Sequence, residues 1–257
     1  MDPAALIGVI LGFAVILISN IMEGGSPASL FLISPMLLVF GTTILVTVGG
    51  GTMADAKTAV RSVKRAFTGK TPSSSDLVPH IVSLAERARR EGLLALEDGL
   101  REIEDPFLIK GVTMAIDGTD PEELRDILEA EVHAKKAEDK QAAKFFSDAG
   151  GYSPTIGIIG TVMGLVHVLG NLSTPDKLGP LIASAFVATL WGVMSANVMW
   201  LPLSNRLKRL SQLEAARMEL VIEGVSAIQS GSNPRLVAEK LRSLLPADQQ
   251  TAEEAAA

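Results

Sequence analysis

The chain has 257 residues, of which 47% are hydrophobic and 20% are charged, and its formal net charge is −6. It contains no cysteine, three histidines and only 4% aromatic residues, which excludes disulfide and thiolate-metal frameworks and gives no reason to expect nucleic-acid binding. So many charges beside so high a hydrophobic fraction indicate that apolar and charged residues occupy separate segments.

Four apolar stretches are long enough to cross the bilayer core, which takes about 20 residues. They cover residues 4–21, 30–50, 154–172 and 178–201. No basic residue precedes the first stretch, and the second follows within a dozen residues. We therefore expect the first to be a retained helix and not a cleaved signal peptide.

The basic residues predict the orientation. Of 23 Lys and Arg residues, 15 lie between positions 52 and 153 and 7 lie after position 201, while Lys177 is in the turn between the third and fourth stretches. Positive charge stays on the cytoplasmic side, so both termini and the long middle segment are expected on the cytoplasmic side of the membrane. The predicted parts are spans one and two, a cytoplasmic helical domain, spans three and four, and C-terminal cytoplasmic helices with a tail, at 1–51, 52–153, 154–203 and 204–257.

The charged segments are predicted to be helical. Apolar residues at helical spacing predict one amphipathic helix over 76–98. Asp105 and Asp120, each followed by Pro, predict helix starts with Asp as the N-cap. The other expectations are amphipathic extensions of spans three and four at 119–146 and 204–228, a loop at 69–75 and a frayed tail at 249–257. The predicted fold is an all-α integral membrane protein with four transmembrane helices and a large cytoplasmic helical domain.

The predicted spans lack acidic residues. All 29 Asp and Glu residues lie outside the apolar cores, although ion pathways usually depend on an intramembrane ionisable group. The spans offer only His167, which is more typical of a satisfied polar residue than of a proton carrier. Either the chain conducts nothing, or another chain brings the acid.

Spans three and four carry small and hydroxyl-bearing residues. Gly160 and Gly164 on the third span, and Gly192 on the fourth, let a neighbouring backbone approach closely. Thr161 and Thr189 add hydroxyl oxygens, which either bond to a helix carbonyl or ligate a hard cation such as Na⁺. Plain helix packing is the simpler interpretation of the small residues, and both interpretations stay open.

Four stretches occur together in an order known from one family: 88–97 (ARREGLLALE), 114–118 (MAIDG), 151–161 (GYSPTIGIIGT) and 183–192 (ASAFVATLWG). With the predicted topology, they resemble the flagellar stator subunits of the MotA/TolQ/ExbB family, the motility protein A type. The resemblance implies a ring-forming subunit of the bacterial inner membrane, with a pentamer surrounding the single transmembrane helices of two MotB/PomB-type partners. Those partners supply an essential Asp and anchor to peptidoglycan. Flow of Na⁺ or H⁺, with no cofactor, then rotates the ring against the rotor switch protein FliG.

The resemblance also implies roles for individual residues. Arg89 and Glu97 match a charged pair that contacts the rotor, and Arg90 is a weaker adjunct. On one continuous helix these two residues are about two turns, or ~12 Å, apart. Pro154 and Pro202, which the pattern alone leaves as helix boundaries or kinks, match the functional prolines of the family.

The ion path is implied by three further positions. Thr161 and Thr189 match pore-lining positions beside the Asp of the partner, and they are candidates for transient Na⁺ contacts. The Thr161 hydroxyl favours sodium, whereas Ala188 matches relatives that include proton-driven ones. Sodium is preferred here, and H⁺ stays open.

Three other functions fit the sequence less well. A TolQ/ExbB-like energiser of envelope transport usually has three spans and lacks the 88–97 stretch. A non-conducting membrane scaffold explains the small residues but not the hydroxyls. An enzyme is rejected, because the Gly-Lys-Thr at 69–71 lacks the earlier Gly of a phosphate-binding loop and position 64 is Lys.

Overall fold

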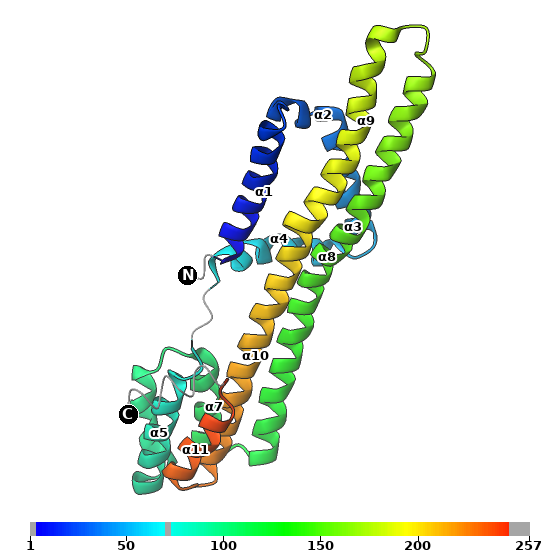
Figure 1. The fold of residues 1–257 in the computed structure, drawn as a ribbon. Coiled ribbons are helices and arrows are strands. Elements are labelled where there is room, and N and C mark those ends of the chain that lie inside the picture. Colours follow the sequence, from blue (N-terminus) through cyan, green and yellow to red (C-terminus); the bar gives the residue numbers. More distant parts are fainter. Residues whose placement is uncertain (1–3, 70–72, 247–257) are drawn as a thin grey trace. The chain divides into compact units, whose positions relative to one another are not determined.

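The computed structural model describes residues 4–69 and 73–246, and every regular element in these residues is a helix. The chain forms two compact units. Unit 1 comprises Met1–Lys70 and Glu138–Leu210, and unit 2 comprises Thr71–Ala137 and Ser211–Ala257. The long helices α8 (Pro121–Leu169) and α10 (Leu201–Gln229) contribute residues to both units (Figure 1).

Unit 1 contains the long apolar helices. Besides parts of α8 and α10, its elements are α1 (Ala4–Met22), the 3-10 turn η1 (Pro27–Leu30), α2 (Ile33–Met36), the π-helical segment η2 (Leu37–Gly41), α3 (Thr42–Gly49), α4 (Met53–Thr68), α9 (Pro175–Ser195) and the π-helical segment η5 (Ala196–Trp200). Elements α2, η2 and α3 follow one another as one helix, and so do α9, η5 and α10. Because α9 begins at Pro175, Lys177 lies in its first turn and not in the connecting turn that the sequence predicted.

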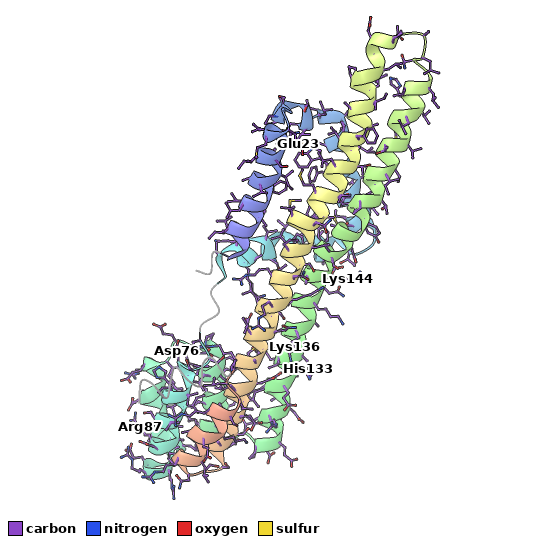
Figure 2. All side chains as sticks on the ribbon, in the orientation of Figure 1. Glu23, Asp76, Arg87, His133, Lys136 and Lys144 are labelled. Carbon is purple, nitrogen blue, oxygen red and sulfur yellow. The ribbon has the colours of Figure 1, made fainter. Side chains whose placement is uncertain are left out.

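Two helices of the described residues, Pro121–Leu169 and Pro175–Gln229, are long and apolar enough to cross a membrane. The helices Leu6–Met22 and Ile33–Gly49 are apolar but shorter. Gly24 has a φ of 81°, which ends α1 next to Glu23 (Figure 2). Each predicted span therefore has a helix at its position.

One aromatic side chain joins three helical segments of unit 1. The Trp191 ring of α9 lies 6.3 Å from the Phe13 ring of α1, 5.4 Å from Phe31 and 5.5 Å from Phe40 of η2, measured between centroids. Its indole N–H also donates a 2.6 Å hydrogen bond to the carbonyl of Leu30. Edge-on aromatic pairs stabilise packing beyond the area they bury, so Trp191 fixes α1 and the 33–49 helix beside α9.

Unit 2 is a cluster of amphipathic helices around an apolar core. Besides parts of α8 and α10, it contains α5 (Leu77–Glu91), η3 (Leu93–Ala95), α6 (Leu96–Gly99), η4 (Leu100–Glu102), α7 (Pro106–Ile116) and α11 (Pro234–Ser243). The Asp105 carboxylate accepts hydrogen bonds from the N–H groups of Phe107 (3.0 Å) and Leu108 (2.9 Å), and Asp120 accepts one from Glu122 (2.9 Å). Both predicted helix starts are confirmed.

The predicted helix over 76–98 is wrong beyond Glu91. Gly92 has a φ of 87°, a left-handed conformation that ends helices, and its N–H donates to the Ala88 carbonyl at 2.9 Å. The chain then forms the short elements η3 and α6. Residues 70–72 of the predicted loop and the whole predicted tail at 249–257 lie outside the described residues.

Neither proline of interest ends a helix. Pro154 lies inside α8. Pro202 is the second residue of α10 and lies two residues after the end of the π-helical segment η5. The interpretation of these prolines as helix boundaries is therefore wrong. A proline within a helix removes one backbone donor and crowds the carbonyl four residues earlier, and π-helical turns are one way in which a helix absorbs such a disturbance.

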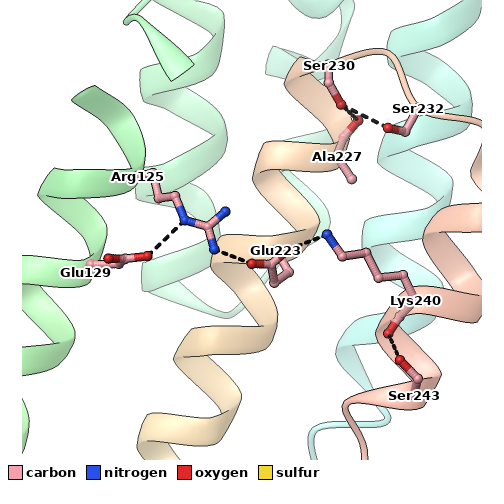
Figure 3. Close-up of polar contacts among 8 residues, drawn as sticks. All are labelled: Arg125, Glu129, Glu223, Ala227, Ser230, Ser232, Lys240 and Ser243. Atoms are coloured by element: carbon pink, nitrogen blue, oxygen red, sulfur yellow. Dashed lines mark hydrogen bonds and ion pairs between the residues drawn. The ribbon is translucent and has the colours of Figure 1, made fainter. Parts of the chain in front are cut away.

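A chain of ion pairs joins three helices of unit 2 (Figure 3). The Glu223 carboxylate of α10 accepts hydrogen bonds from Arg125 of α8 and, at 2.5 Å, from Lys240 of α11. Arg125 also donates to Glu129 at 2.9 Å. Helix α11 packs against α5, so Glu223 connects the helix that supports α5 to the two long helices.

The charged partners shift the ionisation of Glu223. The hydrogen bond from Lys240 lowers the pKa of Glu223 below its ordinary value of 4.5, partial burial opposes this change, and the hydrogen bond from Arg125 adds to the lowering. A lowered pKa in the folded state contributes stability above pH 4.5. That contribution is lost as the pH falls through the lower, folded value.

Glu223→Gln should lower the stability of unit 2 at pH 7 by roughly 1–2 kcal/mol, because two cations lose their charged acceptor. The difference from the unsubstituted protein should shrink as the pH falls below 4.5. Thermal unfolding of the detergent-solubilised chain across pH measures both effects. Glu219→Gln is the matched control, because Glu219 lies on the same helix and pairs with Lys136, but 57% of its side chain is exposed. Equal losses in the two variants would contradict a special role for Glu223.

Candidate functional site

Helices α8 and α9 approach each other so closely that side chains are excluded from part of the contact. A Cβ atom added to Gly157 would lie 2.9 Å from the carbonyl oxygen of Ala188, 3.0 Å from the Cα atom of Thr189 and 3.2 Å from the Cα atom of Gly192. All three neighbours are backbone atoms, which cannot move aside without separating the helices. Gly157 is therefore required for this distance between the helices.

The predicted packing glycines lie along the same contact. A Cβ atom added to Gly160 would lie 2.6 Å from the Cβ atom of Ala188, and one added to Gly164 would lie 2.5 Å from that of Ala185. On the opposite helix, a Cβ atom added to Gly192 would lie 2.7 Å from a backbone oxygen of α8. Ala188 itself is only 2% exposed, so in the single chain its methyl group faces α8.

The two predicted threonines meet within this contact. The Thr161 hydroxyl donates to the Ala185 carbonyl at 3.0 Å, and the Thr189 hydroxyl donates to the Gly157 carbonyl at 3.2 Å. The two hydroxyl oxygens also lie within hydrogen-bonding distance of each other. Because the helix carbonyls can accept both hydroxyl protons, lone pairs remain on both oxygens for a hydrogen-bond donor or a hard cation.

A second hydroxyl pair was not predicted from the sequence. Ser153 and Ser195 are both 0% exposed, and their oxygens lie 2.7 Å apart. Ser153 donates to the Gly192 carbonyl at 2.9 Å. The sequence did indicate that Ser153 faces α9, because it precedes Gly157 by four residues and therefore shares its helix face. Full burial indicates that this pair joins the helices and does not line a path.

The site offers oxygen atoms but no carboxylate. Residues 152–169 of α8 contain neither Asp nor Glu, and Asp176 in the first turn is the only acid of α9. His167 is exposed on α8. Within residues 4–69 and 73–246, no three His, Asp or Glu side chains converge as metal ligands. The arrangement can bind a cation weakly through hydroxyl and carbonyl oxygens, and it cannot by itself exchange a proton on a carboxylate.

The other predicted site residues lie in unit 2. Arg89 and Arg90 belong to α5 and Glu97 belongs to α6, and all three are exposed. No ion pair involves them in the part of the chain that the structure describes. The expectation that one helix carries Arg89 and Glu97 is wrong, because α5 ends between them. Arg87 instead joins the two segments, because its guanidinium lies 3.9 Å from the Asp98 carboxylate.

Comparisons with known proteins agree over nearly the whole chain. Residues 100–220 match the MotA/TolQ/ExbB proton channel family. Motility protein A of Bacillus subtilis (strain 168) is 37% identical over 96% of this chain and 92% of the relative. The structure of the flagellar MotAB stator complex from Bacillus subtilis matches with a TM-score of 0.89 at 36% identity, covering 96% of this chain and 98% of the other. The structure of C. jejuni MotAB matches with a TM-score of 0.91 at 29% identity, covering 96% of this chain and 97% of the other.

Gly157→Ala should destabilise the chain by about 1–3 kcal/mol, because the added methyl group pushes α8 and α9 apart. Thermal unfolding of the solubilised full chain measures the loss. Gly151→Ala is the control on the same helix, since a Cβ atom there would meet nothing within 4 Å. It should be neutral or stabilising, because Ala is the better helix former. Equal behaviour of the two variants would contradict the close contact at Gly157.

Proposed function

The chain belongs to the MotA/TolQ/ExbB proton channel family, and we propose that it is an ion-conducting stator subunit of the flagellar motor. Ion flow through this subunit and a partner drives torque on the rotor. The observation that carries the proposal is the α8–α9 contact, where a pair of threonine hydroxyls lies in an apolar wall that lacks an acid.

The partner supplies the missing carboxylate. An acid beside Thr161 and Thr189 forms a site at which Na⁺ or H⁺ can bind and leave, because intramembrane carboxylates are the usual ion carriers. The matched structures are of MotAB complexes, which supports a MotB-type partner. By family resemblance, that partner has its own transmembrane helix and a peptidoglycan anchor. Pro154 and Pro202 lie on either side of this site in sequence, where the helices can flex. Ala188 contributes by keeping α9 close to α8 behind Thr189.

The proposed topology has four spans, with both termini and unit 2 in the cytoplasm. The distribution of Lys and Arg supports it, because only Lys177 lies on the outer side. Several copies, five by family resemblance, form a ring around the partner helices. The exposed apolar side chains of α1, α3, α8 and α9 suit contact with lipid, with the partner or with neighbouring copies.

The rotor surface is proposed to comprise Arg89 and Arg90 on α5 and Glu97 on α6. Their exposure leaves the charges available to opposite charges on a FliG-type rotor protein. Exposed ion pairs contribute only ~0–1 kcal/mol each, which suits contacts that form and break at every step. The turn at Gly92 presents the basic and acidic charges from two separate segments.

The double substitution Arg89→Ala with Glu97→Ala should reduce swimming severely while leaving membrane insertion and partner binding intact. Motility in a strain without other stators, together with the amount of protein in the membrane, measures the two effects. Lys136→Ala with Glu219→Ala is the matched control, because this pair also removes one exposed cation and one exposed anion from unit 2. Normal swimming of the first variant would refute the proposed rotor surface.

Thr189→Ala should slow ion-driven swimming without reducing the amount of protein in the membrane, because it removes one oxygen from the proposed ion path. Unchanged swimming speed of cells with Thr189→Ala would remove this residue from the path.

With sodium as the ion, the swimming speed of cells with the unsubstituted protein should rise with external Na⁺ at fixed pH and resist a proton uncoupler. Independence from sodium combined with sensitivity to the uncoupler would identify H⁺ as the ion.

A further inference from the structure

Helix α4 has two faces of different chemistry. Its buried face carries Ala59 and Ala66, both 0% exposed, which pack in a cluster with Phe146, Trp200 and Leu203. The opposite face is not covered by any described residue of unit 1. Figure 1 shows that α4 runs across the direction of the long helices and not along them.

The uncovered face is a stripe of basic and apolar side chains. Met53, Lys57, Val60 and Lys64 recur at helical spacing, and Arg61 lies next to them. Met53 and Val60 are each 70% exposed, and the three cations are exposed as well. We call this set of five residues the basic stripe of α4.

The stripe has no compensating acid. Asp55 is the only acid of α4, and its carboxylate accepts hydrogen bonds from the N–H (2.9 Å) and hydroxyl (2.7 Å) of Thr52 in an N-terminal capping box. The stripe cations Lys57, Arg61 and Lys64 take part in no ion pair within the described residues. A charged face with exposed apolar residues among its cations is therefore left without a partner in the single chain.

The position of α4 favours a membrane surface as that partner. Helix α3 ends at Gly49 and α4 begins at Met53, so a short Gly50–Gly51 turn connects the stripe to an apolar helix. If that apolar helix crosses the bilayer, α4 starts where the bilayer ends. At 1.5 Å per residue its 16 residues extend about 24 Å, along which lysine stems can lie on acyl chains while their ammonium groups reach phosphates.

We propose that the basic stripe of α4 binds the headgroups of anionic phospholipids in the cytoplasmic leaflet. Polybasic amphipathic helices next to a span are attracted to such lipids, and apolar residues among the cations insert at the headgroup boundary. The lipid contact holds the cytoplasmic end of the 33–49 helix at the membrane surface while ion flow rotates the ring. This inference rests on the topology given under the proposed function.

Site-specific quenching tests the proposal, and the absence of cysteine from the chain makes single labels possible. A fluorophore is attached at Val60→Cys in the full chain, reconstituted with its partner in vesicles of mixed phosphatidylcholine and phosphatidylglycerol. Quenching by spin-labelled phosphatidylglycerol is compared with quenching by spin-labelled phosphatidylcholine at equal mole fraction. The anionic lipid should quench at least about twofold more strongly, and high salt should remove the preference.

Two variants make the result specific to the stripe. Lys57→Gln, Arg61→Gln and Lys64→Gln together should equalise quenching by the two lipids at Val60→Cys. Met22 is the last residue of α1, and 83% of it is exposed. A label at Met22→Cys should be quenched equally by the two lipids, with or without the three glutamine substitutions. Equal quenching of the Val60→Cys label by the two lipids, with Lys57, Arg61 and Lys64 unsubstituted, would overturn the proposal. Absence of quenching by either lipid would also overturn it, because the stripe would then face a neighbouring copy or water.

A third label separates this proposal from the topology on which it rests. Leu45 is 73% exposed on α3, so a label at Leu45→Cys should be quenched by both lipids if the 33–49 helix spans the bilayer. Quenching at Leu45→Cys without any lipid preference at Val60→Cys would refute only the lipid contact. Absence of quenching at Leu45→Cys, combined with reaction of that cysteine with a membrane-impermeant thiol reagent, would refute the spanning topology itself, and with it the basis of the lipid proposal.

Discussion

The close approach of α8 and α9 is the constraint on which the rest of the proposed site depends. Gly157 makes it possible, because an added Cβ atom would lie within 2.9–3.2 Å of three backbone atoms of α9. At this distance the helix carbonyls come within reach of the Thr161 and Thr189 hydroxyls, so both polar groups are satisfied in an apolar wall without water. The residues of this contact include neither Asp nor Glu. A face that holds oxygen atoms but no carboxylate is the basis of our proposal that ion conduction needs a second chain.

Local rules predicted much of the fold. The apolar stretches and the amphipathic runs after them correspond to helices, since a run of about 20 apolar residues and a 3.6-residue period are properties of the segment itself. Asp105 and Asp120 were identified as N-caps from their own sequence neighbourhood, and hydrogen bonds confirm both. The family could be recognised because several motifs recur in a fixed order, and the comparisons with motility protein A support that recognition.

The features that the sequence predicted wrongly or missed depend on backbone conformation and on contacts between distant residues. Gly92 ends α5 through a left-handed conformation, while the apolar spacing continues past it and so suggested one helix. The π-helical segments η2 and η5 have no sequence pattern that separates them from α-helix. The Ser153–Ser195 pair and the ion pairs of Glu223 join residues far apart in the chain, so only the tertiary arrangement reveals them.

The most direct test of the central claim is ion flux into sealed vesicles that contain the purified full chain, alone or with a co-purified MotB-type partner. The account predicts no flux above empty vesicles for the chain alone, since its apolar wall lacks an acid. It predicts Na⁺ or H⁺ flux when the partner is present, and loss of that flux when the transmembrane Asp of the partner is replaced by Asn. Equal flux with and without the partner would contradict the account, because the chain would then conduct ions without the missing carboxylate.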